Sequence, residues 1–131
     1  MRTLLRTALV IFVIAITIQA VPVTRDNPPV TGTVGAPAPI AATLRRACFD
    51  CHSNETVWPW YSRVAPASWL VARDVHEGRQ HLNFSTWTSL SSSDRRKIAG
   101  EIAEEVEKGA MPPGIYTPLH PEARLSLQDI S

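Results

Sequence analysis

The sequence predicts a mainly α-helical protein, in which one small helical domain follows an N-terminal apolar helix and a proline-rich spacer. Ile98, Ile102 and Val106 recur every fourth residue, which places them on one face of a helix. No stretch alternates apolar and polar residues between turn signals, so a sheet is not expected. With 131 residues, the chain has room for one small domain and a leader segment.

The N-terminus has the pattern of an export signal. Arg2 and Arg6 form a positive flank, and the stretch from Leu4 to Val23 is almost wholly apolar. A helix needs roughly 20 apolar residues to cross a bilayer. Ile18-Gln19-Ala20 is a poor match to a signal-peptide cleavage site. The pattern therefore favours an uncleaved signal anchor over residues 1–23 rather than a cleaved signal peptide, with the positive flank on the cytoplasmic side.

The composition changes abruptly after this apolar stretch. Residues 24–39 are rich in proline, glycine, threonine and valine, and prolines favour extended chain. We interpret this segment as a spacer that joins the membrane helix to a folded domain over residues 40–131. Within that domain we expect helices at 40–47, 66–78 and 93–108.

The ends of these helices carry recognisable signals. Pro66 suits the first turn of the second helix, and Gly78 can end it. Ser93 can cap the start of the third helix, and Gly109 fits the position just past its end.

Charge and cysteine content exclude several classes of protein. The formal net charge is +1 and the basic residues are scattered, whereas a nucleic-acid-binding domain needs a basic face or stripe. We therefore expect no nucleic-acid partner. The only two cysteines lie within five residues of each other, which is too few for a disulfide scaffold.

The two cysteines belong to Cys48-Phe49-Asp50-Cys51-His52, the C-x-x-C-H pattern of c-type haem attachment. Cysteines three residues apart on one helical turn point the same way, so both sulfurs can reach the two vinyl groups on one edge of a haem. The adjacent histidine can then offer a ring nitrogen to the iron. The motif predicts one covalent haem c held by Cys48, Cys51 and His52.

A pair of cysteines at this spacing also occurs in three kinds of site without haem. A thioredoxin-like redox pair follows a strand in a βαβ unit, and no such strand is expected before Cys48. A structural zinc site needs four ligands, and the motif supplies three. A simple disulfide suits an exported protein but gives His52 no role.

The second axial ligand is predicted to be Met111. It is the only methionine apart from the initiator, and it lies in Gly109-Ala110-Met111-Pro112-Pro113-Gly114, a loop that two prolines stiffen. A thioether ligand raises the reduction potential of haem iron and suits electron transfer. His76, His81 and His120 are the rivals, of which His76 is the strongest because it shares a helical face with Trp69.

Four tryptophans fall in one window of the sequence. Large aromatic side chains bring much buried area, so the set predicts core packing, with several rings lining the haem pocket. The four are Trp58, Trp60, Trp69 and Trp87.

Several longer segments accompany the motif. They are Ser53-Asn54-Glu55-Thr56, Trp58-Pro59-Trp60-Tyr61-Ser62, Val64-Ala65-Pro66-Ala67-Ser68-Trp69, Arg73-Asp74-Val75-His76-Glu77-Gly78-Arg79, His81-Leu82-Asn83-Phe84-Ser85, the Met111-Pro112 loop and Leu119-His120-Pro121-Glu122-Ala123-Arg124-Leu125-Ser126. With them, residues 48–126 resemble a family of bacterial haem-binding domains related to cytochrome c. The resemblance implies a cytochrome-c-like helical fold around one covalent haem, held by Cys48, Cys51 and His52, and it supports Met111 as the distal ligand.

The chain departs from that family at its C-terminal side. Such domains usually finish with a helix that packs against the helix before the haem motif. Ser126-Leu127-Gln128-Asp129 looks like the first turn of that helix, and the sequence stops at Ser131. Either the sequence is truncated or the domain does without that helix, and without it we expect the helix at 40–47 to lack a packing partner.

These features predict a monohaem electron carrier, not an enzyme, in the bacterial periplasm or at the outer face of the cytoplasmic membrane. The N-terminal helix would hold it to the membrane, and its partners would be redox proteins that the sequence does not identify. One alternative is a haem-based sensor or peroxidase-like protein with an exchangeable sixth ligand. A weaker alternative is a haem-free thiol redox module.

Overall fold

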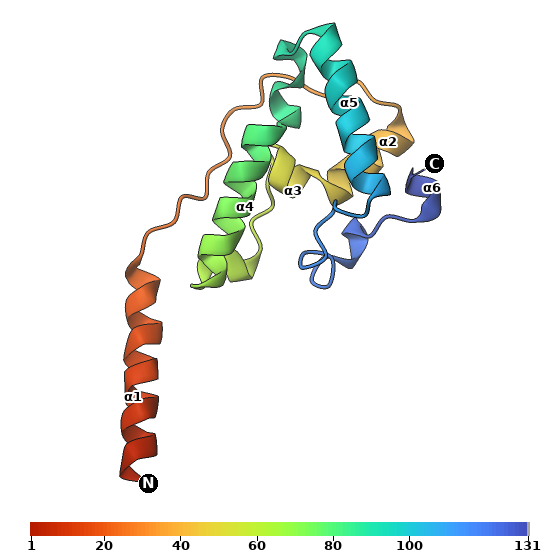
Figure 1. The fold of residues 1–131 in the computed structure, drawn as a ribbon. Coiled ribbons are helices and arrows are strands. Elements are labelled where there is room, and N and C mark those ends of the chain that lie inside the picture. The colour runs from red at the N-terminus through yellow and green to blue at the C-terminus, as the bar shows by residue number, and fades with distance from the viewer. Residues whose placement is uncertain (131) are drawn as a thin grey trace. The chain divides into compact units, whose positions relative to one another are not determined.

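A computed structural model describes residues 1–130, which form helices and no strand (Figure 1). The mainly helical prediction is therefore confirmed. The helices are α1 (Arg2–Thr17), α2 (Ala38–Ala47), α3 (Phe49–His52), α4 (Ala67–His81), α5 (Ser92–Glu107) and α6 (Leu127–Ile130). Short 3₁₀ turns lie at η1 (Ile18–Ala20), η2 (Trp60–Arg63), η3 (Phe84–Ser89) and η4 (Pro121–Ala123).

The chain divides into two compact units. The first contains residues 1–26 and 58–74, and the second contains residues 27–57 together with the chain from residue 75 onward. The first unit therefore holds α1 and the start of α4. The second holds the C-x-x-C-H motif, the remainder of α4 and α5.

Helix α1 and the turn η1 form one continuous apolar helix from Arg2 to Ala20. It is long and apolar enough to cross a membrane, and its side chains are exposed. A signal sequence has the same length and composition, so these features fit a signal anchor and a cleaved signal peptide alike.

In the second unit, α2 leads directly into the motif. The helix predicted at 40–47 is present and begins two residues earlier, at Ala38, with Pro39 in its first turn. Cys48 has φ −126° and ψ −33°, and this break in the helical backbone separates α2 from α3. The buried apolar core of the unit is small because the chain is short. It consists of Ala47, Val75, Phe84 and Ala123.

The proline-rich segment is extended, as expected, but part of it belongs to the second unit. The backbone N–H groups of Thr31 and Gly32 both donate to the Ser85 carbonyl, at 2.9 and 2.8 Å. The Asn27 side chain donates to the Thr56 carbonyl at 2.9 Å. Contacts of this segment with the second unit therefore begin at residue 27. Extended chain has unpaired backbone groups, and here the domain supplies their partners.

Helix α4 does not end at Gly78, contrary to the prediction, but continues to His81. Gly78 has another role. A Cβ atom at this position would lie 2.6 Å from the Cys51 carbonyl oxygen, closer than real Cβ contacts allow. Glycine is therefore required for close approach of α4 to the motif rather than for ending the helix.

Helix α5 matches the prediction to within one residue at each end. Its N-cap is Ser91 rather than Ser93, because the Ser91 hydroxyl accepts a hydrogen bond from the Asp94 N–H at 3.1 Å. Gly109 has φ +69°, the left-handed conformation that favours glycine just past a helix.

The expectation that α2 lacks a packing partner is wrong, because the turn η4 packs against it and the C-terminal turn α6 makes polar contacts with it. The Asp129 carboxylate pairs with Arg46 and accepts a hydrogen bond from Thr43 at 3.1 Å, both on α2. Arg46 also donates to two backbone carbonyls at the turn η4, those of Glu122 at 2.8 Å and Arg124 at 3.0 Å.

We expect Asp129→Asn to lower the thermal stability of the protein at neutral pH. Hydrogen bonds from Arg46 and Ser126 hold the pKa of the Asp129 carboxyl well below its ordinary value of 3.8. A carboxyl group whose pKa is lower in the folded than in the unfolded chain stabilises the fold at any pH above its unfolded-state pKa. This stabilisation is lost as the pH falls from the unfolded-state pKa to the folded-state pKa. The difference in Tm between the two proteins should therefore shrink as the pH drops below 3.8.

Circular dichroism melting curves of the full chain in detergent at pH 7, 4 and 3 measure this difference. Glu101→Gln on the exposed face of α5 is the matched control and should leave Tm unchanged. An Asp129→Asn deficit that stays constant over this pH range would contradict the assignment.

Candidate haem-binding site

The C-x-x-C-H motif closes into one helical turn. The backbone N–H groups of Cys51 and His52 both donate to the Cys48 carbonyl, at 3.2 and 2.9 Å. Cysteines three positions apart on such a turn lie on the same side of it. Neither cysteine is in a disulfide bond.

The His52 ring is oriented by backbone carbonyls of the segment at the end of α4. Its Nδ1 lies 2.9 Å from the Gly78 oxygen and 3.2 Å from the Leu82 oxygen. A carbonyl can only accept, so Nδ1 carries the proton and Nε2 retains its lone pair. Burial lowers the pKa of His52, and the two carbonyl bonds oppose this effect in part. The imidazole is therefore neutral at neutral pH, the form in which histidine binds a metal.

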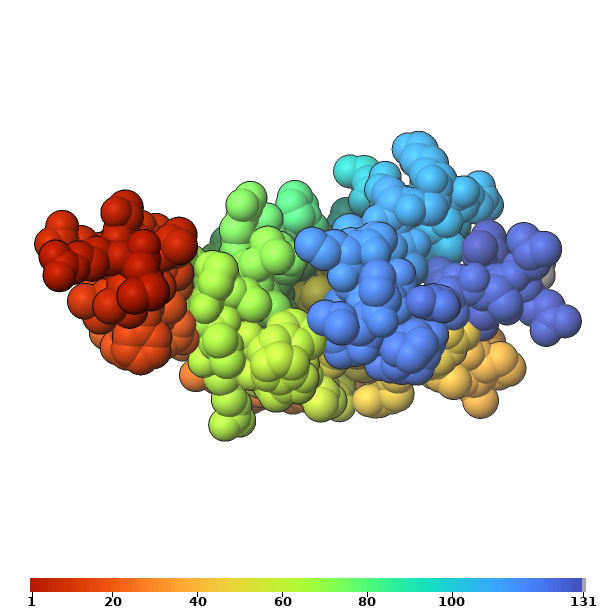
Figure 2. All heavy atoms as spheres, turned by 90° about the horizontal axis from the view of Figure 1, so that it is seen from below, coloured from red at the N-terminus to blue at the C-terminus, as the bar shows by residue number. Residues whose placement is uncertain are grey.

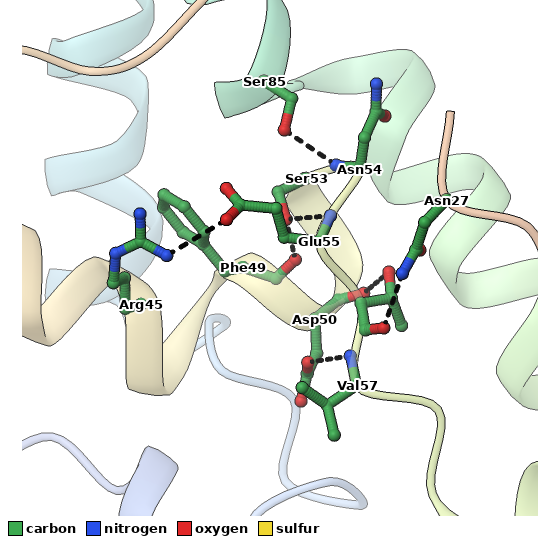
Figure 3. Close-up of polar contacts among 10 residues, drawn as sticks. Asn27, Arg45, Phe49, Asp50, Ser53, Asn54, Glu55, Val57 and Ser85 are labelled. Atoms are coloured by element: carbon green, nitrogen blue, oxygen red, sulfur yellow. Dashed lines mark hydrogen bonds and ion pairs between the residues drawn. The ribbon is translucent and has the colours of Figure 1, made fainter. Parts of the chain in front are cut away.

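Side-chain hydrogen bonds hold the chain that follows the motif, as Figure 3 shows. This segment has no regular structure, so side chains satisfy its backbone groups. The bonds join Asp50 Oδ1 to the Val57 N–H (2.9 Å), Ser53 Oγ to the Phe49 carbonyl (2.7 Å) and the Glu55 N–H (2.9 Å), and Ser85 Oγ to the Asn54 N–H (2.9 Å).

Arg79 fastens α4 to the same segment. Its Nε donates to the Ser53 carbonyl at 2.7 Å, and its Nη2 donates to the Thr56 hydroxyl at 2.9 Å. The Thr56 hydroxyl in turn donates to the Asp50 carbonyl at 2.7 Å, inside the motif. The sequence alone assigned no role to Arg79, because its partners lie more than 20 positions away.

An open apolar cavity of about 400 Å³ borders the motif at Cys48. Ile102 and Val106, from the apolar stripe of α5, line its other side. The other lining residues are the apolar Pro39, Ile40, Leu44, Ala99, Ala103, Leu125 and Ile130 and the polar Thr43, Gln128 and Asp129. Burial raises the pKa of the Cys48 thiol to about 11, and the nearby Arg46 charge partly opposes this effect.

Met111 lies just past α5, with 38% of its surface exposed. No contact brings its sulfur onto the motif, but the loop that carries it is tied there. The Tyr116 hydroxyl donates to Asp50 Oδ2 at 2.8 Å, and Asp50 is the residue before Cys51. Tyr116 was not among the predicted site residues, because no local pattern predicts a contact across 66 positions.

The rival histidines make local contacts. His76 is exposed on α4, where its Nε2 lies 2.9 Å from the Gln80 amide nitrogen, one turn further along. His120 stacks on Tyr116, with ring centroids 4.0 Å apart, and its Nδ1 lies 3.1 Å from a Glu122 oxygen. His81 is exposed at the end of α4. Within residues 1–130, no three His, Cys, Asp or Glu side chains form a group that could hold a metal ion.

The tryptophans do not share one environment. Trp87 packs near the buried Phe84, with ring centroids 6.1 Å apart, and Phe84 lies edge-on to the His52 ring at 6.5 Å. The other three belong to the first unit, where Trp60 is 77% exposed. Trp69 is exposed as well, so the expectation of core packing is wrong for Trp60 and Trp69.

The second unit therefore carries two cysteines and an oriented, neutral imidazole on one helical turn. The profile of a family described as haem-binding domain matches residues 13–131. The chain therefore belongs to this family of haem-binding domains. No curated protein and no solved structure gave a match to the chain.

Proposed function

We propose that this protein binds one haem c covalently through Cys48 and Cys51, with His52 as an axial ligand of the iron. The observation that carries the proposal is the geometry of His52. Its Nδ1 is committed to the Gly78 and Leu82 carbonyls, which leaves Nε2 available on the same turn as the two thiols. Membership of the haem-binding domain family supports the choice of cofactor.

The residues at this site fit a haem. Two thiols on one turn match the two vinyl groups, and a neutral imidazole is the iron ligand of many haem proteins. The apolar cavity beside Cys48 suits a large, mostly apolar group. When bound, haem supplies one-electron chemistry at its iron.

The protein contributes orientation and exclusion of water. The two carbonyls that accept from His52 Nδ1 fix the tautomer and make Nε2 a more basic ligand. Phe49 and Phe84 stack with ring centroids 5.1 Å apart, and the buried Phe84 lies edge-on to the His52 ring at 6.5 Å. These contacts favour a rigid site whose ligand changes little between two oxidation states.

The Cys48 environment argues against the thiol redox alternative. Thiol–disulfide exchange needs a thiolate, and reactive cysteines have a pKa below the ordinary value. Burial instead raises the pKa of Cys48 to about 11. Because this thiol stays protonated at neutral pH, Cys48 is poorly suited to be the attacking thiolate.

We further propose electron transfer as the function, at the outer face of a bacterial cytoplasmic membrane, with α1 as an uncleaved anchor. The length and apolar character of Arg2–Ala20 support the anchor, and the positive charges of Arg2 and Arg6 support its orientation. Membrane redox proteins would be the partners.

The full chain, produced in a bacterium with cytochrome c maturation machinery, tests the proposal. We expect haem to remain on the polypeptide in a denaturing gel, and sharp low-spin bands in the reduced visible spectrum. The protein should also sediment with the membrane fraction. Its mass should equal that of the intact chain plus one haem. A colourless chain, obtained while a control cytochrome matures normally, would overturn the haem assignment.

Met111→Ala in the same preparation tests the sixth ligand. We expect the oxidised wild-type protein to show a weak long-wavelength sulfur-to-iron band, and the variant to lose it. Carbon monoxide should bind the reduced variant much faster than the wild type, because it needs an open coordination position on the iron. Fast carbon monoxide binding by the wild type would favour the second candidate, a sensor or peroxidase-like protein with an exchangeable sixth ligand. The partial exposure of Met111 supports this candidate.

A further inference from the structure

We propose that residues 58–70 form a membrane-interface anchor, which places exposed aromatic and apolar side chains among the lipid headgroups at the outer end of α1. The partner is the bilayer itself. This inference rests on the proposed role of α1 as a membrane anchor, and it adds a second, lateral contact with the lipid. The tryptophan-rich window of the sequence would thereby have a function outside the haem site.

The first observation is a direct connection between this segment and the end of α1. Gln19 forms two hydrogen bonds with the backbone of Ala65. The Ala65 N–H donates to Gln19 Oε1 at 2.9 Å, and Gln19 Nε2 donates to the Ala65 carbonyl at 3.2 Å. Nε2 also donates to the Ala15 carbonyl at 2.9 Å, so both amide hydrogens have acceptors.

A second connection follows a few residues later. The Arg25 guanidinium donates to the Ser62 carbonyl at 2.9 Å. Both connections lie within the first compact unit, which contains α1 and residues 58–74. Figure 2 looks along α1 and shows the yellow-green segment before α4 beside it. The segment is therefore held at one end of the apolar helix.

The length of the helix sets the depth of this contact. Nineteen residues from Arg2 to Ala20 span about 28 Å at 1.5 Å per residue, close to the roughly 30 Å of a hydrocarbon core. With Arg2 at the cytoplasmic surface, Gln19 lies at the opposite edge of the hydrocarbon. Ala65 lies at the same level because it is hydrogen-bonded to Gln19.

The side chains around Ala65 match this location. Trp60 is 77% exposed, and Val64, Trp69 and Leu70 are also exposed. Tyr61 packs edge-on against Trp60, with ring centroids 5.8 Å apart. Tryptophan and tyrosine are enriched at membrane–water interfaces because one end of each ring is apolar and the other is polar.

A neighbouring arginine adds a charge of the appropriate sign. Arg63 is exposed at the end of η2, next to the apolar residues, and its long side chain can reach lipid phosphates. A protein partner could also cover exposed tryptophans. The bilayer is the better occupant because the segment is bonded to the end of the helix that would emerge from it.

The test uses the full-length haem protein, labelled with 5-fluorotryptophan, in lipid nanodiscs and in the reduced state. Fluorine NMR resonances are assigned by single Trp→Phe substitutions. Two relaxation reagents are compared: a lipid with a gadolinium-chelating headgroup, and a water-soluble gadolinium chelate. We expect the Trp60 signal to be lost with the gadolinium lipid and retained with the soluble chelate.

The two reagents also separate the alternatives. Retention of the Trp60 signal with the gadolinium lipid overturns the inference. If the soluble chelate then removes the signal, the ring lies in water; if the signal remains, protein covers the ring. Failure of the chain to co-purify with nanodiscs contradicts the anchoring role of α1 itself, and the inference with it. The Trp60 side chain is exposed, so Trp60→Phe should fold normally and its fluorine resonance can be assigned from that variant.

Discussion

Replacing both Cys48 and Cys51 with serine is expected to remove haem from the denatured polypeptide completely. In the wild type, two thioethers would keep the cofactor attached after unfolding, whereas His52 alone binds iron only while the fold holds it. Haem staining of a denaturing gel measures the loss, and the mass of the intact chain should fall by one haem. The folded variant can retain some haem through His52, so the denatured sample is the decisive one.

Asp50→Asn is the matched control for the cysteine variants. It alters the same turn, its Oδ1 can still accept from the Val57 N–H, and its new amide can donate to the Tyr116 hydroxyl in place of the bond that Asp50 Oδ2 accepts. We expect it to retain haem on the gel at the wild-type level. Haem that survives denaturation in the double serine variant would show that the attachment does not run through these thiols.

Gly78→Ala should destabilise the protein by about 1–3 kcal/mol, the usual cost of forcing an extra carbon into a packed site. The added Cβ would lie 2.6 Å from the Cys51 oxygen and 3.1 Å from its carbonyl carbon. The backbone must then move, and α4 must withdraw from the motif. Urea unfolding of the detergent-solubilised haem protein, followed in the visible spectrum, measures the change.

Gly100→Ala is an unusually close control for this substitution. Gly100 also lies inside a helix, α5, but nothing within 4 Å would meet its Cβ. Alanine there should stabilise the protein by about 0.5–1 kcal/mol, because it lowers the entropy cost of helix formation. Effects of opposite sign are therefore expected at the two glycines. Equal effects would remove the argument that Gly78 permits the approach of α4.

The same Gly78→Ala variant should also alter the haem. Withdrawal of α4 lengthens the bond from His52 Nδ1 to the Gly78 carbonyl, now 2.9 Å, and makes the imidazole a less basic ligand. A less basic ligand stabilises oxidised iron less, so the reduction potential should rise. Gly100→Ala should leave the potential unchanged. This readout separates a positioning role for Gly78 from a general loss of stability.

Features that depend on neighbours along the chain could be predicted from the amino-acid sequence alone. The helical fold and the bounds of α5 follow from a repeat every fourth residue and from capping residues next to it. Two cysteines, their spacing and the adjacent histidine lie within five residues, so the motif could be recognised without knowing any tertiary contact. Family membership agrees with this local prediction of a haem-binding domain.

Features that depend on residues far apart required the three-dimensional fold. Gly78 was predicted to end a helix, because the residues next to a glycine do not distinguish one that ends a helix from one that permits close packing. The tie from Tyr116 to Asp50 spans 66 positions, and the tie from Gln19 to Ala65 spans 46. The orientation of His52 likewise depends on carbonyls 26 and 30 positions away. Backbone carbonyls are present at every residue, so only the fold determines which of them meet the histidine.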